Sequence, residues 1–401
     1  MLSRITNIGK IVTWSPNEGK LVSLENQEIL IEDGIIKEIG ESVSGAEVEF
    51  DADGALITPG FIDSHTHPIF FGNRGNEFGM RVAGKSYEDI TKAGGGIISS
   101  INGVRNASED ELYAFCQNHI NFFLDHGTTT IEAKSGYGLT LEDELKSLRV
   151  IKRLNENSDL DLVPTFMGAH DFPKEFKGNG DSYVDLICDE MIPAVAAEKL
   201  AEYCDVFCEK GYFSTAQSLR ILETAKQYGL IPRLHADEFE DSDAASLAAK
   251  VGAVSADHLM AVSNTGINDM AKSGVIATLL PGTTFFLGKN TYANGRKMID
   301  MGCDVAIATD FNPGSCTLQS MPMIISLSTL YCGLSMEEAF VSATYNGAKS
   351  INRENQIGAI QIGYKADLLF WDIESIDEIP YWLGSDRILS VMKNGELIQE
   401  D

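Results

Sequence analysis

The sequence predicts an α/β fold: a (β/α)8 barrel of the TIM type that carries a small β-sandwich domain built from both chain termini. Two observations favour this fold. Short apolar segments alternate with helical patterns through the middle of the chain, whereas both ends carry closely spaced hairpin signals. We expect residues 1–57 plus 357–401 to form the small composite β domain and residues 58–356 to form the barrel.

Tight-turn dipeptides between apolar runs indicate short antiparallel strands at both ends of the chain. Such dipeptides accept the positive φ angles that two-residue hairpins require. Neither end contains enough apolar residues to fold alone, so we expect the two ends to pair with each other. The dipeptides are Asp33-Gly34, Asp53-Gly54 and Asn394-Gly395.

Eight compact apolar segments predict the barrel strands. Eight strands that alternate with helices are the number that a (β/α)8 barrel requires. The alternative is an open doubly wound sheet, which is disfavoured because no Gly-x-Gly-x-x-Gly turn opens its first helix. The segments are residues 56–62, 128–133, 162–167, 206–208, 231–234, 254–256, 275–279 and 305–308.

Four of the predicted helices begin with a capping pair. In such a pair a hydroxyl and a side chain three residues later satisfy backbone N–H groups that the helix leaves free. The pairs are Ser108 with Glu111, Thr140 with Asp143, Ser214 with Gln217, and Ser335 with Glu338.

Composition excludes several classes of protein. The 401 residues include 59 acidic and 31 basic ones, and this net charge of −28 argues against a nucleic-acid partner. No apolar run approaches the roughly 18 residues of a membrane span, and the first residues lack the apolar centre of a signal peptide. The seven cysteines show no Cys-x-x-Cys spacing and predict no disulfide framework. We therefore expect a soluble, cytoplasmic protein with no membrane partner, in which an anionic substrate needs a local cation.

Polar residues at the ends of barrel strands are candidate functional residues, because (β/α)8 barrels carry their active sites there. His65 and His67 follow the first barrel strand two residues apart, so both side chains point to the same side. A single inward histidine is more often a core residue. Two at this spacing indicate a pair of adjacent metal ligands.

Other predicted strands end in the same way. Three imidazoles and one carboxylate suit Zn²⁺ or an iron ion, and the ligand types alone do not separate these metals. We expect one divalent or ferric ion per chain, with one coordination position open for water. The remaining histidines, His119 and His126, fall on or at the end of a predicted helix and are interpreted as structural. The polar strand ends are His170, His235, His258 and Asp310.

Three of these residues or their neighbours are candidate catalytic groups. A bound divalent ion lowers the pKa of its water from about 15.7 towards roughly 7, and Asp310 can accept the proton that this water loses. Glu238, three residues after His235, can carry a proton to a leaving nitrogen, although it also suits the start of a helix. His258 can orient the water or an oxyanion instead of binding metal.

Motifs along nearly the whole chain resemble the amidohydrolase superfamily and, within it, the imidazolonepropionase family. They occur in the family's order, which makes a chance match improbable. They include His65-Thr66-His67, Phe71-Gly72-Asn73-Arg74, Ala93-Gly94-Gly95-Gly96-Ile97, Glu132-Ala133-Lys134-Ser135-Gly136-Tyr137-Gly138, Gly168-Ala169-His170, His235-Ala236-Asp237, Ala256-Asp257-His258 and Asp310-Phe311-Asn312-Pro313-Gly314.

The resemblance implies hydrolysis of the cyclic amide C–N bond of 4-imidazolone-5-propanoate to N-formimidoyl-L-glutamate, the third step of histidine degradation. It also implies a homodimer. The implied metal ligands are His65, His67, His235 and Asp310. The implied substrate contacts are Arg74, Tyr137, His170, Glu238, Asn312, Gly314 and Ser315, among which Arg74 can hold the propionate.

Three alternatives remain open. Other branches of the superfamily bridge two metals with a carboxylated lysine, for which Lys134 is the nearest candidate here, although Lys134 also fits the family's own loop motif. A second alternative is a deaminase of amino-heterocycles, which would release ammonia. The third is a non-catalytic protein that keeps the barrel and the metal.

Overall fold

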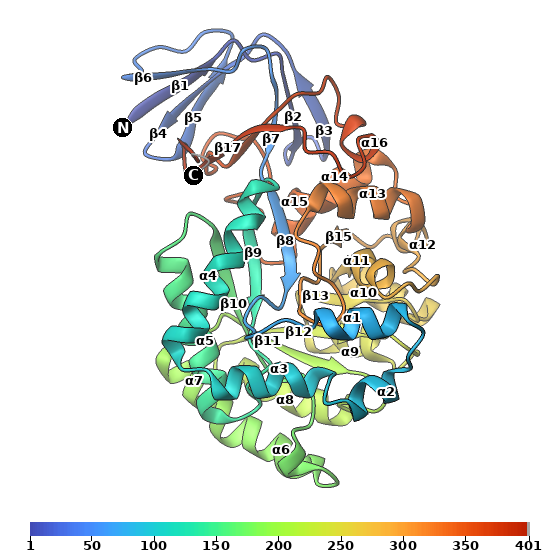
Figure 1. Cartoon of the computed structure of the whole chain (residues 1–401). Coiled ribbons are helices and arrows are strands. Elements are labelled where there is room, and N and C mark those ends of the chain that lie inside the picture. The colour runs from blue at the N-terminus through green and yellow to red at the C-terminus, as the bar shows by residue number, and fades with distance from the viewer. Residues whose placement is uncertain (399–401) are drawn as a thin grey trace.

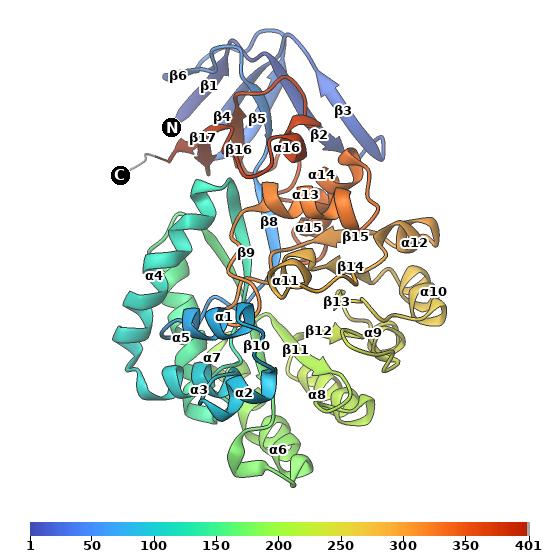
Figure 2. The ribbon, with the colours of Figure 1, turned by 45° about the vertical axis from the view of Figure 1, so that its right-hand side comes forward.

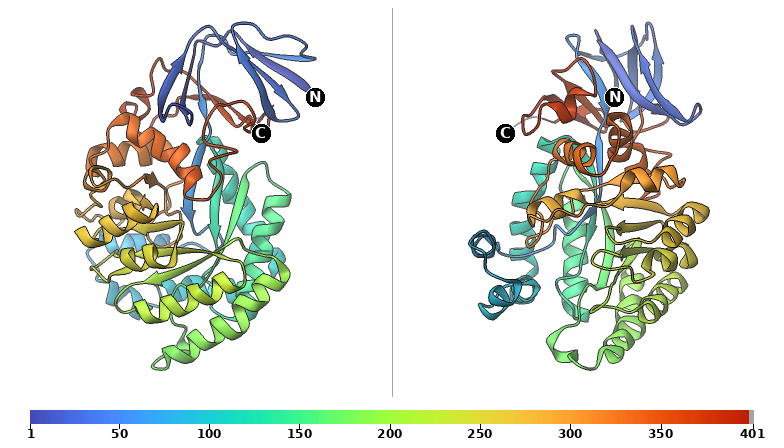
Figure 3. Two further views of the ribbon diagram at one scale, coloured as in Figure 1. Left: turned by 180° about the vertical axis from the view of Figure 1, so that it is seen from behind. Right: turned by 90° about the vertical axis from the view of Figure 1, so that its right-hand side faces the viewer.

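The computed structural model describes residues 1–398 and shows a helix-surrounded barrel with two further sheets at one end (Figure 1). The last three residues of the expected terminal domain, 399–401, lie outside the described residues. The first and the last of the described residues both lie at the sheet end of the molecule, and the same division is visible after rotation (Figures 2 and 3). The predicted fold class is confirmed.

One of the two sheets at this end combines strands from both ends of the chain. Within residues 1–398, one sheet has the order β5-β4-β1-β6 and the other has the order β18-β17-β16-β7-β2-β3. C-terminal β16 pairs antiparallel with N-terminal β7, so the two chain ends share the second sheet, whereas the first consists of N-terminal strands alone. The strands are β1 (Leu2–Thr6), β2 (Lys10–Ser15), β3 (Lys20–Leu24), β4 (Glu28–Glu32), β5 (Ile35–Gly40), β6 (Val48–Asp51), β7 (Leu56–Pro59), β16 (Leu368–Trp371), β17 (Ile388–Lys393) and β18 (Glu396–Leu397).

Two of the three tight turns close hairpins. Asp33 and Gly34 have φ angles of 49° and 81° between β4 and β5, and Asn394-Gly395 connects β17 to β18. Asp53-Gly54 also has positive φ angles, but it links β6 to β7, which lie in different sheets. This third dipeptide therefore transfers the chain from one sheet to the other.

Eight parallel strands form the barrel in the described part of the chain, in the order β15-β14-β13-β12-β11-β10-β9-β8. Each strand pairs with the next one along the chain, as in a (β/α)8 barrel. The strands are β8 (Phe61–Thr66), β9 (Thr128–Lys134), β10 (Asp161–Ala169), β11 (Tyr203–Cys208), β12 (Ile231–Ala236), β13 (Ser255–His258), β14 (Ile276–Leu279) and β15 (Val305–Ile307).

The expected single strand over residues 56–62 is wrong, because the chain breaks at Gly60 into β7 and β8. β7 belongs to a terminal sheet and β8 to the barrel. A Cβ at Gly60 would lie 2.4 Å from the Thr129 side chain, so only glycine permits this close approach. The division into 1–57 plus 357–401 and 58–356 stays a prediction.

The barrel closes beside the ends of its first and last strands. Thr66 forms a parallel bridge with Phe311. The Asp310 N–H donates to the His65 carbonyl oxygen at 3.0 Å, and the His67 N–H donates to the Phe311 carbonyl oxygen at 2.8 Å. Closure therefore brings His65 of β8 and His67, which directly follows β8, next to the aspartate after β15.

Helices cover the outside of the barrel, and the predicted caps hold their starts. Capping boxes are present at Ser108, Ser214 and Ser335, and the Thr140 hydroxyl accepts from the Asp143 N–H. The helices are α1 (Gly75–Val82), α2 (Tyr87–Lys92), α3 (Ile97–Asn106), α4 (Glu109–Asp125), α5 (Leu141–Glu156), 3-10 helix η1 (Lys174–Phe176), α6 (Gly180–Leu186), π-helix η2 (Ile187–Met191), α7 (Ile192–Glu198), α8 (Thr215–Gln227), α9 (Ala244–Val251), α10 (Asn264–Ser273), α11 (Pro281–Phe286), α12 (Gly295–Asp300), α13 (Met321–Tyr331), α14 (Met336–Ala343), α15 (Tyr345–Lys349) and α16 (Glu378–Tyr381).

The sequence predicts neither disulfide bonds nor a membrane-spanning helix. All seven cysteines lie within the described residues, and each is buried and free. Among residues 1–398, no helix has the length and apolar character needed to cross a bilayer.

Candidate active site

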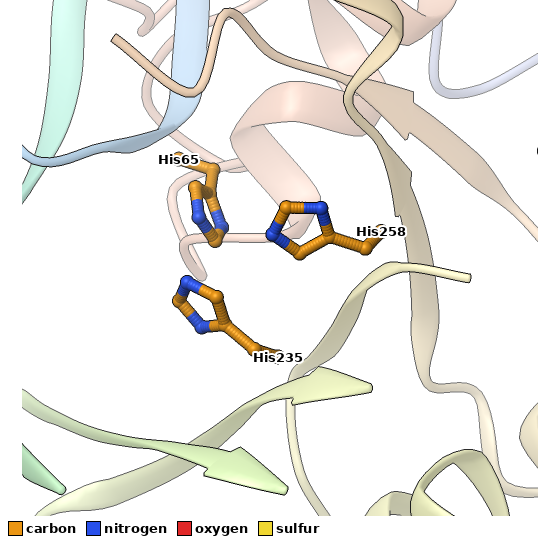
Figure 4. Close-up of side chains that lie close together, drawn as sticks. All are labelled: His65, His235 and His258. Atoms are coloured by element: carbon orange, nitrogen blue, oxygen red, sulfur yellow. The ribbon is translucent and has the colours of Figure 1, made fainter. Parts of the chain in front are cut away.

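The predicted metal-ligating side chains converge where the barrel strands end. His65 lies in β8, His235 in β12 and His258 at the end of β13. Figure 4 shows these three imidazole rings pointing into one space. His67 and Asp310 lie in the same region, and none of the five side chains belongs to a residue more than 3% exposed. The cluster is therefore shielded from bulk water.

Short distances join the nitrogen and oxygen atoms of this cluster. The Nε2 atoms of His67 and His235 lie 3.2 Å apart. Oδ1 of Asp310 lies 3.6 Å from Nε2 of both His65 and His67. Two sets of donors lie within 4.8 Å of one another: His65, His67 and Asp310, and His65, His235 and His258. The structure brings the four predicted ligands together and adds His258 to the same cluster.

The donor set fits a divalent metal ion. Nε2 of His65 is buried and has no hydrogen-bond partner in the described part of the chain, and the two Nε2 atoms of His67 and His235 face each other. Burial, followed by nearby positive groups, lowers the pKa values of His65 and His67 well below their usual range. Neutral imidazoles offer lone pairs, which is the form that binds metal.

Two buried carboxylates orient these imidazoles from behind. Nδ1 of His65 lies 2.7 Å from Oδ2 of Asp257, and Nδ1 of His235 lies 3.1 Å from both oxygens of Asp205. An Nδ1–H that donates to a carboxylate leaves the Nε2 lone pair facing the centre of the cluster. Burial lowers the pKa of His235, but Asp205 outweighs this effect and the net direction is upward.

Lys134 and Arg233 form buried ion pairs with these carboxylates and compensate their negative charges. The Lys134 ammonium lies 2.8 Å from Glu132 and 2.7 Å from Asp205, and the Arg233 guanidinium lies 3.3 Å from Asp257. Burial opposes the charge on Lys134, yet the two carboxylates raise its pKa above the usual value. A protonated lysine amine does not take up carbon dioxide, so the network argues against a carboxylated Lys134.

Strained backbone accompanies the cluster. His258 and Asp310 have φ angles of 79° and 55°, and Asp237, two residues after His235, has a φ angle of 51°. Residues other than glycine rarely adopt this conformation, which costs about 1–3 kcal/mol and is common at functional sites. The positive φ angles therefore fall at or just after the ends of β12, β13 and β15, where the cluster lies.

A cavity of about 540 Å³ opens beside the cluster. This volume suits a small-molecule ligand. Every predicted substrate contact lines this cavity, and so do four of the five cluster residues. Several further charged and aromatic side chains line it as well, which the sequence did not predict. The predicted lining residues are Arg74, Tyr137, His170, Glu238, Asn312, Gly314 and Ser315, and the added ones include Glu77, Arg81, Lys85, Phe207 and Lys289.

Arg74 lies at the start of α1, where Glu77 and Gly314 hold it. Its Nε and Nη2 donate to the Glu77 carboxylate at 2.9 and 2.7 Å. The guanidinium lies directly against Gly314, where a Cβ would lie 2.2 Å from Nη1 of Arg74. Gly314 therefore leaves the space that the arginine occupies.

We expect Gly314→Ala to raise KM about 10- to 100-fold with a much smaller change in kcat, because the new methyl group displaces the Arg74 guanidinium and weakens a charge-assisted hydrogen bond to an anionic substrate. Initial-rate kinetics measure both constants. Gly79→Ala is the matched control, since a Cβ at this α1 position meets nothing within 4 Å. Equal KM values for the two variants would contradict this role of Gly314.

Hydrogen bonds of the Asn312 side chain hold the conformation of the loop after β15. Its Oδ1 accepts from the N–H groups of Gly314 and Ser315 at 2.8 and 2.7 Å, and its Nδ2 donates to the Asp310 carbonyl oxygen at 2.7 Å. Asn312 thus holds the loop on which Gly314 and Ser315 reach the cavity.

Tyr137 and His170 also line the cavity, next to His67. The His170 ring stacks on His67 with centroids 4.9 Å apart, and Nδ1 of His170 lies 2.9 Å from the Gly136 carbonyl oxygen. Burial lowers the pKa of His170 to about 3, so this ring is neutral. The Tyr137 ring lies 5.2 Å from His170, and burial raises the pKa of its hydroxyl. Both groups therefore face the cavity as uncharged hydrogen-bonding partners.

Glu238 and His258 lie next to each other at the cavity wall, with 3.8 Å between Oε2 and Nε2. Burial, reinforced by the charge of Asp310, raises the pKa of Glu238 to about 8. Burial also raises the pKa of Asp310 to about 6. At neutral pH, Glu238 therefore holds a proton that it can donate, whereas Asp310 is largely ionised.

Two functional residues carry no sequence signal noted above: Asp205 and Asp257, whose carboxylates contact Nδ1 of His235 and of His65. A charged residue inside an otherwise apolar strand is a signal that could have found Asp205, because isolated charges are seldom buried without a partner. Asp257 immediately precedes His258 within a motif already noted. Neither residue is near its imidazole partner in the sequence, so the pairing itself was not visible.

The family to which the chain belongs can now be compared with its fold and its histidine and aspartate cluster. The sequence profile of the amidohydrolase family matches residues 56–398. Solved structures support the fold: guanine deaminase from C. acetobutylicum superposes with a TM-score of 0.76 at 17% identity over 100% of both chains. An adenosine deaminase from Xanthomonas campestris with bound zinc gives 0.74 at 18% identity, over 100% of this chain and 94% of its own.

Relatives of higher sequence identity place the chain in one family of amidohydrolases. An imidazolonepropionase of Brevibacillus brevis is 48% identical over 389 residues, covering 94% of this chain and 91% of the relative. One of Clostridium tetani is 45% identical and covers 98% of this chain and 97% of its own length. The chain belongs to the imidazolonepropionase family of amidohydrolases.

Proposed function

We infer that this chain hydrolyses the cyclic amide C–N bond of 4-imidazolone-5-propanoate to N-formimidoyl-L-glutamate, the third step of histidine degradation. Family membership supports this inference. The observation that carries it is the cavity itself, in which a histidine and aspartate cluster lies beside the guanidinium of Arg74. The cluster suits amide hydrolysis and the guanidinium suits the propionate carboxylate.

We propose that one divalent or ferric ion, zinc or iron, is held by His65, His67, His235 and Asp310. When bound, such an ion lowers the pKa of a water molecule and polarises a carbonyl group. Asp310 accepts a proton from the water, whose oxygen adds to the ring carbonyl carbon. His258 or Glu238 supplies a proton to the ring nitrogen as the C–N bond breaks.

The cavity walls position the substrate. Arg74 binds the carboxylate of the propionate tail, and Tyr137 and His170 contact the ring as neutral partners. The loop that carries Gly314 and Ser315 forms a further part of the cavity wall. We further propose that the enzyme is a homodimer of the cytoplasm with no nucleic-acid or membrane partner; the net charge of −28 agrees with the absence of a nucleic-acid partner.

A product assay on freshly prepared 4-imidazolone-5-propanoate tests the inferred reaction. Metal-loaded protein is expected to form N-formimidoyl-L-glutamate without releasing ammonia. Release of ammonia from amino-heterocycles, with no turnover of the imidazolone, would identify a deaminase instead. Saturable binding of the imidazolone without product would identify a non-catalytic protein.

We expect Glu238→Gln to lower kcat about 10²- to 10⁴-fold, as the loss of a general acid does. Because the pKa of Glu238 is raised to about 8, its proton is present below that pH and is lost as the pH rises through it. The unsubstituted enzyme should therefore lose activity above about pH 8, and the variant should lack this alkaline limb. A pH–rate profile measures both effects.

Glu240→Gln is the matched control for this prediction. Glu240 follows two residues later on the same loop, and it lies on the surface in an ion pair with Lys210. Its amide variant should keep the kcat and the pH profile of the unsubstituted protein. Retention of full kcat and of the alkaline limb by Glu238→Gln would assign the proton to another group.

A further inference from the structure

A second guanidinium group lies beside Arg74 in the cavity. Arg81 is seven residues further along, two turns down α1 on the same face. Its Nη2 donates to the Gly314 carbonyl oxygen at 3.4 Å, and Gly314 is the residue on which Arg74 packs. The two guanidinium groups therefore meet at one residue of the cavity wall.

Aromatic rings fix the position of Arg81. Its Cζ lies 5.7 Å from the centroid of the Phe78 ring and 5.3 Å from that of Phe286. Rings at this distance attract a cation and restrict its side chain to one region. Arg81 is thus held at the cavity with no carboxylate at ion-pair distance among the described residues, because the nearby Glu77 pairs with Arg74.

The polar groups of Arg81 are incompletely satisfied. Its Nε–H is buried and has no hydrogen-bond partner within the described residues. A buried donor without an acceptor costs about 1–3 kcal/mol, so the Nε–H requires an acceptor that the described chain does not provide, such as a ligand or a water molecule. Burial, and then the charge of Arg74, lowers the pKa of Arg81, although arginine stays protonated at neutral pH.

The charges around Gly314 do not balance. Glu77 takes two of the five donor hydrogens of Arg74 and compensates one positive charge. Arg74 and Arg81 together with Glu77 leave one excess positive charge. One carboxylate, with two oxygens and about four acceptor positions, matches this excess in both charge and hydrogen bonding.

We propose that Arg81 is a second substrate-binding residue, which together with Arg74 binds the carboxylate of the substrate and selects acids over neutral analogues. This proposal rests on the inferred reaction for the identity of the substrate. The role of Arg81 goes beyond the inferred reaction, because the selectivity for a carboxylate is assigned to a pair of arginines and not to Arg74 alone. A neutral tail would leave both guanidinium groups without the acceptor that their excess charge requires.

Binding of an unreactive ligand pair tests Arg81 separately from turnover. The probes are imidazole-4-propanoate and its uncharged carboxamide, titrated calorimetrically into the metal-loaded protein. We expect Arg81→Met to weaken binding of the acid about 10- to 100-fold and to leave binding of the amide unchanged. Arg81→Lys, which keeps the charge but loses the fork of donors, should recover part of the affinity for the acid.

Lys272→Met is the matched control, because it removes the same unit of charge from an exposed residue of α10 that lies outside the cavity lining. It should change binding of the acid less than about 2-fold, since solvent screens an exposed charge. Equal losses of acid and amide affinity in Arg81→Met would show that Arg81 only packs against the aromatic rings. An unchanged affinity for the acid, or no preference for it in the unsubstituted protein, would also overturn the proposal.

Kinetics complete the test. If the inferred reaction is correct, Arg81→Met should raise KM for 4-imidazolone-5-propanoate by the same factor as it weakens acid binding, with kcat changed less than about 3-fold. A large loss of kcat at constant KM would contradict a binding role. Failure of the unsubstituted protein to form N-formimidoyl-L-glutamate would refute the reaction, whereas the acid and amide titrations would still decide the role of Arg81.

Discussion

His235→Ala is expected to abolish both metal retention and turnover, with a loss of at least about 10³-fold in kcat. His235 provides the Nε2 atom that faces His67, and Asp205 fixes that orientation from the other side of the ring. Alanine removes the donor at the centre of the cluster and leaves the Asp205 carboxylate without its imidazole. Metal content after dialysis and the rate of N-formimidoyl-L-glutamate formation measure the two losses.

His126→Ala is the control for this experiment, since His126 caps the C-terminal end of α4, outside the cavity lining. It should retain one metal ion per chain and the full rate. Full activity of His235→Ala would refute the proposed ligand set. Two metal ions per chain in the unsubstituted protein would instead favour a binuclear site.

Lys134→Met is expected to reduce the free energy of unfolding by about 3–5 kcal/mol, because it leaves two buried carboxylates without their cation. Lys134 is fully buried between Glu132 and Asp205. Burial alone would raise the pKa of Asp205, but His235 and Lys134 hold it well below its usual value. Without the ammonium, Asp205 is less able to stay ionised, so the orientation of His235 weakens as well.

Urea-induced unfolding of the metal-loaded protein measures this loss, and metal affinity measures the effect on His235. Lys210→Met is the matched control, because Lys210 pairs with Glu240 at the exposed surface and such pairs contribute about 0–1 kcal/mol. A Lys134→Met variant as stable as this control would show that the buried carboxylates are satisfied without the ammonium.

Local sequence signals predicted much of the fold. Turn dipeptides set the hairpin at Asp33-Gly34, and hydroxyl caps set helix starts such as Ser108 and Ser214, because these depend on neighbours within a few residues. There were two exceptions. Asp53-Gly54 joins strands of different sheets and closes no hairpin, and the segment over residues 56–62 divides at Gly60 into strands of two sheets, where Gly60 closely approaches Thr129.

The sequence by itself determined which residue types stand at the ends of the barrel strands, including the spacing of His65 and His67 and the aspartate at position 310. Only the tertiary structure decided which atoms meet. The bridge between Thr66 and Phe311 places Asp310 beside His65, and barrel register places Asp205 behind His235. These partners are up to hundreds of residues apart in the chain, so strand order, register and closure decide their distances, and no local pattern encodes them.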